Sequence, residues 1–183
     1  MYVVIDFETT GTFESQYFPT PIEIGAIKLN SKLEIVGKFQ SLIFIDTNKV
    51  SDFIVNYTGI KKEELVKAPL MGDVFHNFKN FCVGNKNKIL AWPISFEMPI
   101  LQHCYCQLLG YKKFPLDRRG IDIGSIAYKW SYKNLKHSKL RELEEEGFSM
   151  RNFCDALEIE PEEPVHRALP DVETEVKIMR KIW

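Results

Sequence analysis

Two acidic residues lie two positions apart near the start of the chain, in the stretch MYVVIDFETTG. The opening apolar run predicts a β-strand over residues 2–8. Successive strand side chains alternate between faces, so Asp6 and Glu8 point the same way, about 6.6 Å apart along the chain. Two carboxylates on one surface repel each other or raise one pKa, and a divalent cation such as Mg²⁺ or Mn²⁺ removes that penalty. The pair therefore indicates a metal site at the end of this strand.

The turn that follows the strand strengthens the metal-site interpretation. A D-x-E pair alone is weak, because eight Asp and seventeen Glu in 183 residues give about 0.7 chance matches. Thr9, Thr10 and Gly11 come next, and small residues let the backbone approach a ligand closely. A solvated strand end is the alternative that the pattern leaves open.

A second constellation, HRALPD, places His166 five residues before Asp171. With four His and eight Asp, about 0.2 such matches are expected by chance, so this signal is the more specific one. Proline suits the first helical position, so Pro170 predicts a helix that carries Asp171 in its first turn and leaves His166 in the preceding loop. A helix that starts between the two lets both face one site, although a free surface histidine is the alternative.

The third stretch, AWPISFEMPIL, contains Glu97 in the first turn of a predicted helix that follows a short buried strand. An acid there is also stabilised by the helix dipole, so Glu97 alone proves nothing. Trp92 directly precedes this stretch's proline and helix.

The remaining pattern predicts an α/β fold with a mixed sheet and packed helices. Strands are expected at residues 2–8, 21–29, 33–45, 88–92 and 121–123, the first three forming a meander. Helices are expected around KKEEL, over 72–83, over 96–109 with Ser95 as N-cap, and over 124–130, 150–157 and 170–183.

Length and composition limit the number of domains, the kinds of partner and the cellular setting that the sequence allows. The length fits one domain over residues 1–183, and the net charge of −1 means that any contact with nucleic acid must be local. The four cysteines lack metal-ligand spacing and are expected to be reduced thiols. No apolar run approaches the about 18 residues that span a bilayer, so we expect a soluble, cytoplasmic protein without a membrane partner.

The motifs DFETTG, SFEMPIL and HRALPD, in this order, resemble the three exonuclease motifs of the DEDDh (DnaQ-like) 3′→5′ exonuclease superfamily. The resemblance covers nearly the whole chain. It implies a ribonuclease H-like fold: a mixed five-stranded sheet, an antiparallel three-strand meander plus parallel strands, flanked by helices.

The resemblance also implies a reaction, namely two-metal hydrolysis of single-stranded DNA or RNA 3′ ends to nucleoside 5′-monophosphates. Two Mg²⁺ or Mn²⁺ ions are implied, held by Asp6, Glu8, Glu97 and Asp171. His166 is implied as the general base, since a neutral imidazole accepts a proton near pH 7. The implied contacts to the terminal nucleotide come from residues around Thr9, Thr10 and Gly11. Trp92 is a further candidate, which either stacks on a base or packs in the core.

Glu97 departs from the family pattern, which generally has aspartate at this position. The additional methylene adds about 1.5 Å of reach, and small misplacements in such a site can lower the rate about 10²-fold. The alternative function is therefore a catalytically weakened nucleic-acid-binding or partner-docking module on the same fold. The sequence does not distinguish DNA from RNA as the substrate. It also leaves open whether the chain forms a homodimer or binds a polymerase partner.

A basic stretch could attract the substrate by contacting its phosphates, which would make binding salt-dependent. It carries Lys129, Lys133, Lys136, Lys139 and Arg141. The alternative interpretation is a solvated face that balances the acids of the following ELEEEG.

Overall fold

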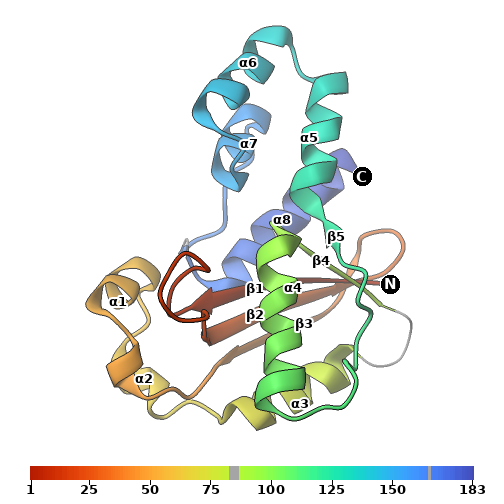
Figure 1. The fold of residues 1–183 in the computed structure, drawn as a ribbon. Coiled ribbons are helices and arrows are strands. Elements are labelled where there is room, and N and C mark those ends of the chain that lie inside the picture. Colours follow the sequence, from red (N-terminus) through yellow and green to blue (C-terminus); the bar gives the residue numbers. More distant parts are fainter. Residues whose placement is uncertain (83–86, 165) are drawn as a thin grey trace.

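The computed structural model describes residues 1–82, 87–164 and 166–183, and its centre is a five-stranded sheet (Figure 1). The strands are β1 (Tyr2–Thr9), β2 (Pro21–Leu29), β3 (Ile35–Leu42), β4 (Lys88–Ala91) and β5 (Ile121–Asp122). The helices are α1 (Asp52–Thr58), α2 (Lys62–Leu65), α3 (Met71–Cys82), α4 (Ile94–His103), α5 (Ile123–Asn134), α6 (His137–Glu146), α7 (Met150–Leu157) and α8 (Ala168–Ile182).

The sheet has the order β3-β2-β1-β4-β5, so the strand that carries Asp6 and Glu8 lies at its centre. β1 pairs antiparallel with β2, and β2 with β3, which forms the predicted meander. β4 pairs parallel with β1, and β5 parallel with β4. The predicted mixed five-stranded sheet with flanking helices is thus confirmed.

Helices cover both faces of the sheet because alternate residues of the central strand are apolar on both sides. Ile5 and Phe7 face a core formed with α3 and α4. Val4, on the opposite face, packs in a second core with Val172 and Val176 of α8. Asp6 and Glu8 share the face of Val4, so the two acids lie under the helix that carries Asp171.

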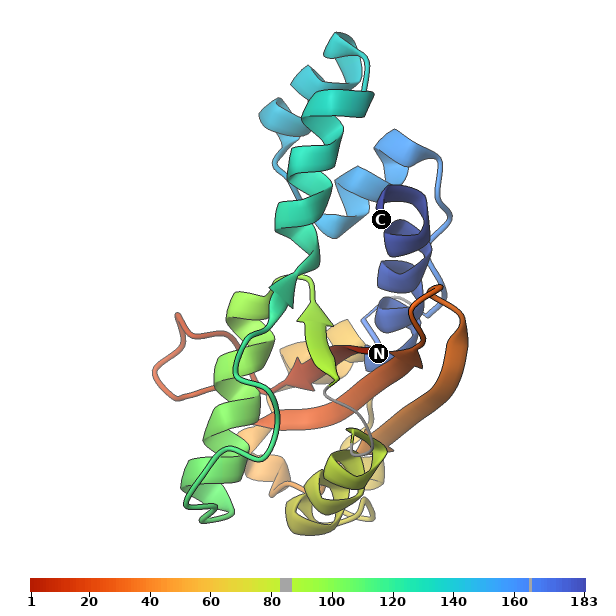
Figure 2. The ribbon, with the colours of Figure 1, turned by 90° about the vertical axis from the view of Figure 1, so that its right-hand side faces the viewer.

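Helices α5, α6 and α7 extend away from the sheet on one side, as both ribbon views show (Figures 1 and 2). Their own apolar cluster includes Leu143, Phe153 and Cys154 and joins them to the end of α8 through Ile178. The predicted basic stretch lies here, where Lys139 pairs with Glu158 and Arg141 with Glu145. These pairs favour the interpretation that this face balances its own acids.

The first correction to the predicted elements concerns the third strand, expected over 33–45 but found over Ile35–Leu42. Leu33 has a φ of 60° and belongs to the turn, so the strand cannot begin there. Beyond the strand, the amide of Phe44 donates to the carbonyl of Pro69 and leaves the sheet pairing.

The second correction concerns the helix expected over 96–109 with Ser95 as N-cap. The helix α4 begins at Ile94, and Pro93 is the N-cap residue, without a side-chain cap. The carboxylate of Asp122 accepts a hydrogen bond from the Ile94 amide at 2.8 Å instead. A cap supplied by a residue 28 positions away cannot be found by a local motif. After His103 the chain continues as a π-helix over Cys104–Leu108.

The third correction concerns the last helix, which begins at Ala168, so Pro170 is in its third position and not its first. A proline is tolerated there because the first four amides of a helix have no intrahelical partner. Asp171 is in the first turn and His166 precedes the helix, as expected.

Of the remaining elements, β2 and α7 have the predicted bounds, 21–29 and 150–157, and β4 ends one residue earlier than predicted, at Ala91. The helix predicted over 124–130 is longer, α5 running from Ile123 to Asn134, while the fifth strand ends at Asp122. The helices α1 and α6 were not predicted. The helix predicted over 72–83 is α3, and its predicted last residue, 83, lies outside the described residues.

All four cysteines are free thiols, as predicted. Within the described ranges, no helix combines the length and apolar character needed to cross a membrane.

Candidate active site

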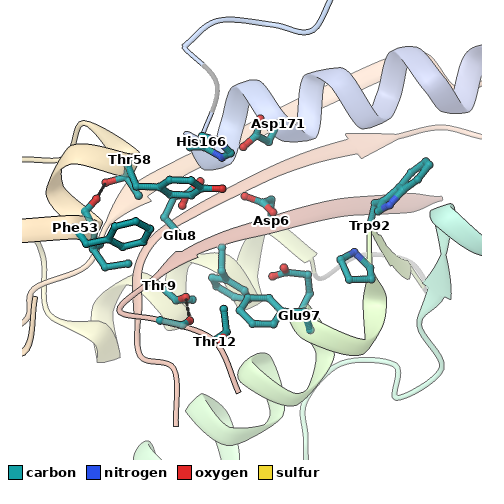
Figure 3. A pocket seen from close by; sticks show the side chains of 16 residues that line it. Asp6, Glu8, Thr9, Thr12, Phe53, Thr58, Trp92, Glu97, His166 and Asp171 are labelled. Carbon is teal, nitrogen blue, oxygen red and sulfur yellow. Dashed lines mark hydrogen bonds between the residues drawn. The ribbon is translucent and has the colours of Figure 1, made fainter. Parts of the chain in front are cut away.

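Three acids from two elements meet at the centre of the sheet: Asp6 and Glu8 from β1 and Asp171 from the first turn of α8. One carboxylate oxygen of each lies within 4.8 Å of the others. Figure 3 shows the three side chains pointing toward one another between the strand and the helix. The structure therefore brings together the acids of the first and last sequence motifs.

The fourth acid, Glu97, projects into the same cleft from the first turn of α4 (Figure 3). Its side chain is only 2% exposed, and its Oε2 atom has no hydrogen-bond partner among the described residues. Burial, and then the nearby carboxylate of Asp6, raises the pKa of Glu97 well above its usual range. A buried carboxylate without a partner is costly, so this oxygen is suited to a cation.

The acids of the cluster form no ion pairs among the described residues, and the charge of Arg167 only partly offsets the rise in the pKa of Glu8. Burial, and then the repulsion of neighbouring carboxylates, raises the pKa of Asp6 well above its usual range. The same two causes raise the pKa of Glu8 to about 8, and burial raises that of Asp171 to about 6. None of the ion pairs found between described residues involves these three acids. An all-oxygen donor set of this kind fits hard divalent cations such as Mg²⁺ or Mn²⁺.

We expect the metal-free protein to lose stability as the pH rises from 5 to 8. The folded state holds protons on Glu8 (pKa about 8) and Asp171 (pKa about 6) that the unfolded chain, with ordinary pKa values near 4, has released. Because the folded state binds more protons in this window, unfolding becomes easier as the pH increases. Thermal melting in EDTA at several pH values measures this trend.

Saturating Mn²⁺ should flatten or reverse the trend, because ions compete with protons for the same oxygens. The variant Glu8→Gln is the matched control, and its melting temperature in EDTA should depend less on pH. A wild-type melting temperature that rises between pH 5 and 8 in EDTA would contradict the expectation.

The histidine of the last motif, His166, lies beside Asp171 at the edge of the cleft (Figure 3). Its backbone has a φ of 62°, a left-handed conformation that costs a non-glycine residue about 1–3 kcal/mol. Its ring stacks on Tyr57 of α1, with 3.9 Å between the ring centroids. Partial burial, and then the positive charge of Arg151, lowers the pKa of His166, so the imidazole is neutral at pH 7.

The cleft has a volume of about 440 Å³. Some of the residues predicted to contact substrate line it, and one does not. Thr9, Gly11 and Trp92 line it, and the Thr9 hydroxyl donates to the Gly11 carbonyl at 2.6 Å. Thr10 does not line this cleft, because its hydroxyl accepts from the Thr20 amide at 3.1 Å in a neighbouring pocket.

Trp92 borders the cleft and also packs in the core, so the structure confirms its core packing, and its stacking on a base stays a prediction. Trp92 stacks on Phe148 at 6.0 Å between ring centroids. Its backbone amide donates to the carboxylate of Glu175 at 3.2 Å.

Sequence reasoning missed several aromatic residues that line the cleft. Phe53 and Tyr57 lie on the unpredicted helix α1, stacked with 5.6 Å between ring centroids, and Phe96 of α4 also lines the cleft. The available signal was the i, i+4 spacing of the two aromatics behind Ser51, which caps α1 through the Ile54 amide.

Comparison with known proteins identifies the class that this sheet and site define. A family model described as "Exonuclease" matches residues 3–179. The chain therefore belongs to this exonuclease family, and the class predicted from the three motifs is confirmed.

Among curated proteins, the chain is similar to DNA polymerase III PolC-type of Bacillus cereus, 30% identical over 176 residues, which is 94% of this chain and 10% of the polymerase. It is also 37% identical over 83 residues to the PolC-type enzyme of Caldanaerobacter subterraneus, covering 45% of this chain and 6% of that protein. The chain thus spans at most about a tenth of these polymerases.

Among solved structures, a 3′-exonuclease studied for recognition of the histone mRNA stem-loop has a TM-score of 0.77 at 21% identity, covering 98% of this chain and 62% of that one. The nuclease domain of 3′hExo, a DEDDh family member bound to rAMP, has a TM-score of 0.73 at 20% identity, covering 98% and 90%. E. coli Exonuclease I with a dT13 oligonucleotide has a TM-score of 0.75 at 16% identity, covering 99% and 40%. Because the sequence identities are 16–21%, the similarity to these three structures establishes the fold alone.

Proposed function

We propose that the chain is a divalent-metal-dependent 3′→5′ exonuclease that releases nucleoside 5′-monophosphates from unpaired 3′ ends, and that residues 1–183 form one exonuclease domain. The observation that carries the proposal is the cluster of Asp6, Glu8 and Asp171, whose oxygens lie within 4.8 Å of one another. This cluster lies in a cleft that His166 also lines. Acids that hold cations, beside a neutral base, are what metal-assisted phosphodiester hydrolysis requires.

The roles of the acids follow from their places in the cleft. Asp6, Glu8 and Asp171 would hold the cations, with Glu97 as a further ligand from the opposite side. When bound, two divalent ions stabilise the attacking and leaving oxygens of an in-line displacement. The raised pKa values of the acids describe the metal-free state, and a cation restores their ionised form.

His166 would take the proton from the attacking water at an imidazole nitrogen. Its lowered pKa keeps it unprotonated at neutral pH, which is the state that a general base needs. The Tyr57 ring, 3.9 Å away between centroids, limits how the imidazole can turn. Thr9, Gly11 and Trp92 would contact the terminal nucleotide.

The aromatic lining supports an unpaired 3′ end as substrate. The exposed fractions of Phe53 and Tyr57 are 69% and 48%, although both rings border the cleft. Exposed aromatic faces bind unpaired bases by stacking, at about 1–3 kcal/mol per base, whereas paired bases within a duplex do not offer their faces. This contribution does not depend on the sugar, so both DNA and RNA remain substrates of the proposal.

The similarity to PolC-type DNA polymerase III supports proofreading as one setting for this activity. The structural neighbours were studied with an mRNA stem-loop and with a dT13 oligonucleotide, which supports both nucleic acids as test substrates.

The proposal is tested with matched DNA and RNA oligonucleotides, single- and double-stranded, labelled at the 5′ end and incubated with Mn²⁺ or Mg²⁺. We expect a ladder of products shortened from the 3′ end of the single strands, and no products in EDTA. If no substrate is shortened with either metal while a related exonuclease degrades the same strands, the enzyme proposal is wrong.

A second candidate function rests on Glu97, where the family generally has aspartate. The longer side chain could bind the second cation poorly, which would leave a domain that binds oligonucleotides with little cleavage. Such a domain would show oligonucleotide binding without metal-stimulated product formation.

The role of Glu97 is testable directly. We expect Glu97→Gln to lower kcat about 10²-fold, because it removes the charge of a buried carboxylate whose Oε2 has no protein partner. Steady-state rates at saturating Mn²⁺ measure the loss, and Glu97→Asp separates the two functions. Full wild-type activity in Glu97→Gln would exclude Glu97 as a ligand, whereas a large gain in Glu97→Asp would favour the weakened module.

A further inference from the structure

A buried carboxylate in β2, that of Glu23, connects this strand to the start of α8. Glu23 is fully buried and lies directly opposite Glu8 in the register of the sheet. The guanidinium of Arg167 donates to both of its oxygens, from Nε at 2.9 Å and from Nη2 at 2.8 Å. The backbone amide of Ala168 donates to the same carboxylate at 3.1 Å, and Gln40 donates a further hydrogen bond at 2.9 Å.

The helix start lies unusually close to the strand at Gly25, two residues further along β2 and opposite Asp6. A Cβ atom at Gly25 would lie 2.3 Å from the carbonyl carbon of Ala168. Only a glycine permits this approach without a shift of the helix. The bidentate ion pair and the close approach therefore fix the turn between His166 and Asp171 against the strand next to β1.

We propose that the Glu23–Arg167 pair is a positioning device, which holds the start of α8, and with it His166 and Asp171, in place beside the acids of β1. Neither Glu23 nor Arg167 lines the cleft, so the pair acts through its neighbours. The left-handed conformation of His166 persists only where its surroundings fix it. The adjacent Arg167 supplies that constraint through two charge-assisted hydrogen bonds. The catalytic part of this inference rests on the proposed function.

The test compares Arg167→Met, Arg167→Lys and Glu23→Gln with a matched control, Lys38→Met. Lys38 of β3 forms an ion pair with Glu173 of α8, away from the turn between His166 and Asp171. Replacing Lys38 therefore also removes a contact between the sheet and this helix. The first readout is amide hydrogen exchange of residues 166–171. We expect exchange in Arg167→Met to be at least about tenfold faster than in the wild type, and exchange in Lys38→Met to be unchanged.

The second readout is hydrolysis of the p-nitrophenyl ester of thymidine 5′-monophosphate, a substrate too small to reach beyond the cleft. We expect Arg167→Met to lower kcat about 10²-fold with KM changed less than about threefold, because small displacements of reacting groups act mainly on the chemical step. Arg167→Lys should lose about tenfold, since it keeps the charge and loses the bidentate geometry. Lys38→Met should stay within about twofold of the wild type.

The double variant Glu23→Gln/Arg167→Met shows whether the two residues act as one unit. Its loss in kcat should not exceed that of the more damaging single variant. Losses that multiply, or fast exchange of residues 166–171 with unchanged kcat, would overturn the positioning role. If Arg167→Met fails to fold, the hydrogen exchange and kcat of Arg167→Lys and Glu23→Gln are compared with those of Lys38→Met instead.

A failure of the proposed function is distinguishable from a failure of this inference. If the wild-type protein hydrolyses no substrate, two other measurements still test the positioning role of the Glu23–Arg167 pair. They are the hydrogen exchange of residues 166–171 and the Mn²⁺ dissociation constant, measured by electron paramagnetic resonance. Arg167→Met should then bind Mn²⁺ at least about tenfold more weakly than Lys38→Met, because Asp171 is displaced. Equal exchange and equal Mn²⁺ affinity in the two variants would overturn the inference.

Discussion

Asp6→Asn is expected to lower kcat at least about 10³-fold while raising the melting temperature of the metal-free protein. Asp6 lies in the central strand, and its carboxylate is part of the cluster with Glu8 and Asp171. An amide of the same shape is a poor ligand for a divalent cation, so the loss should exceed the 10–100-fold typical of residues that only support ligands. In EDTA the same change removes one of three mutually repelling acids, which favours the folded state.

The two effects of Asp6→Asn are measured separately, by steady-state kinetics at saturating Mn²⁺ and by thermal melting in EDTA at pH 7.5. Asp155→Asn, which changes an exposed acid of α7 outside the cleft, is the control, and it should alter neither quantity appreciably. A variant that retains activity, or that melts below the wild type in EDTA, would contradict the assignment of Asp6 to a metal site.

The sequence predicts the part of the site that local patterns encode. Strand periodicity places Asp6 and Glu8 on one face, and the pleated β1 shows them there. The proline and the spacing of HRALPD place Asp171 in the first turn of a helix and His166 before it, which is also what the structure has. The resemblance to the exonuclease motifs implied the mixed five-stranded sheet, whereas the strand order β3-β2-β1-β4-β5 was not predicted, because no local pattern contains it.

Long-range contacts account for what the sequence does not predict. The N-terminus of α4 is capped by Asp122 from β5, so the local signal at Ser95 misleads. The Glu23–Arg167 pair joins residues 144 positions apart, although a charged residue within the apolar strand PIEIGAIKL was a signal that a buried partner had to exist. Similarly, the stacking of Tyr57 on His166 depends on how α1 packs beside the cleft.

His166→Ala is expected to lower kcat about 10³-fold while leaving the Mn²⁺ affinity within about threefold of the wild type. General-base catalysis contributes about 10²–10⁴-fold, and the imidazole is not one of the clustered acid ligands. Kinetics at saturating Mn²⁺ and metal titration by electron paramagnetic resonance separate the two quantities. His103→Ala is the control, because this ring stacks on Phe18 and does not line the cleft.

The pH dependence of kcat identifies His166 more specifically than the loss of rate does. Burial and the charge of Arg151 both lower the pKa of the imidazole, so the acid limb of the rate should lie at lower pH than that of an unperturbed histidine. Removing the cation in Arg151→Met favours the imidazolium, which raises the pKa of His166 and moves the acid limb to higher pH. An acid limb that does not move in Arg151→Met, or near wild-type turnover of His166→Ala at neutral pH, would show that another group takes the proton.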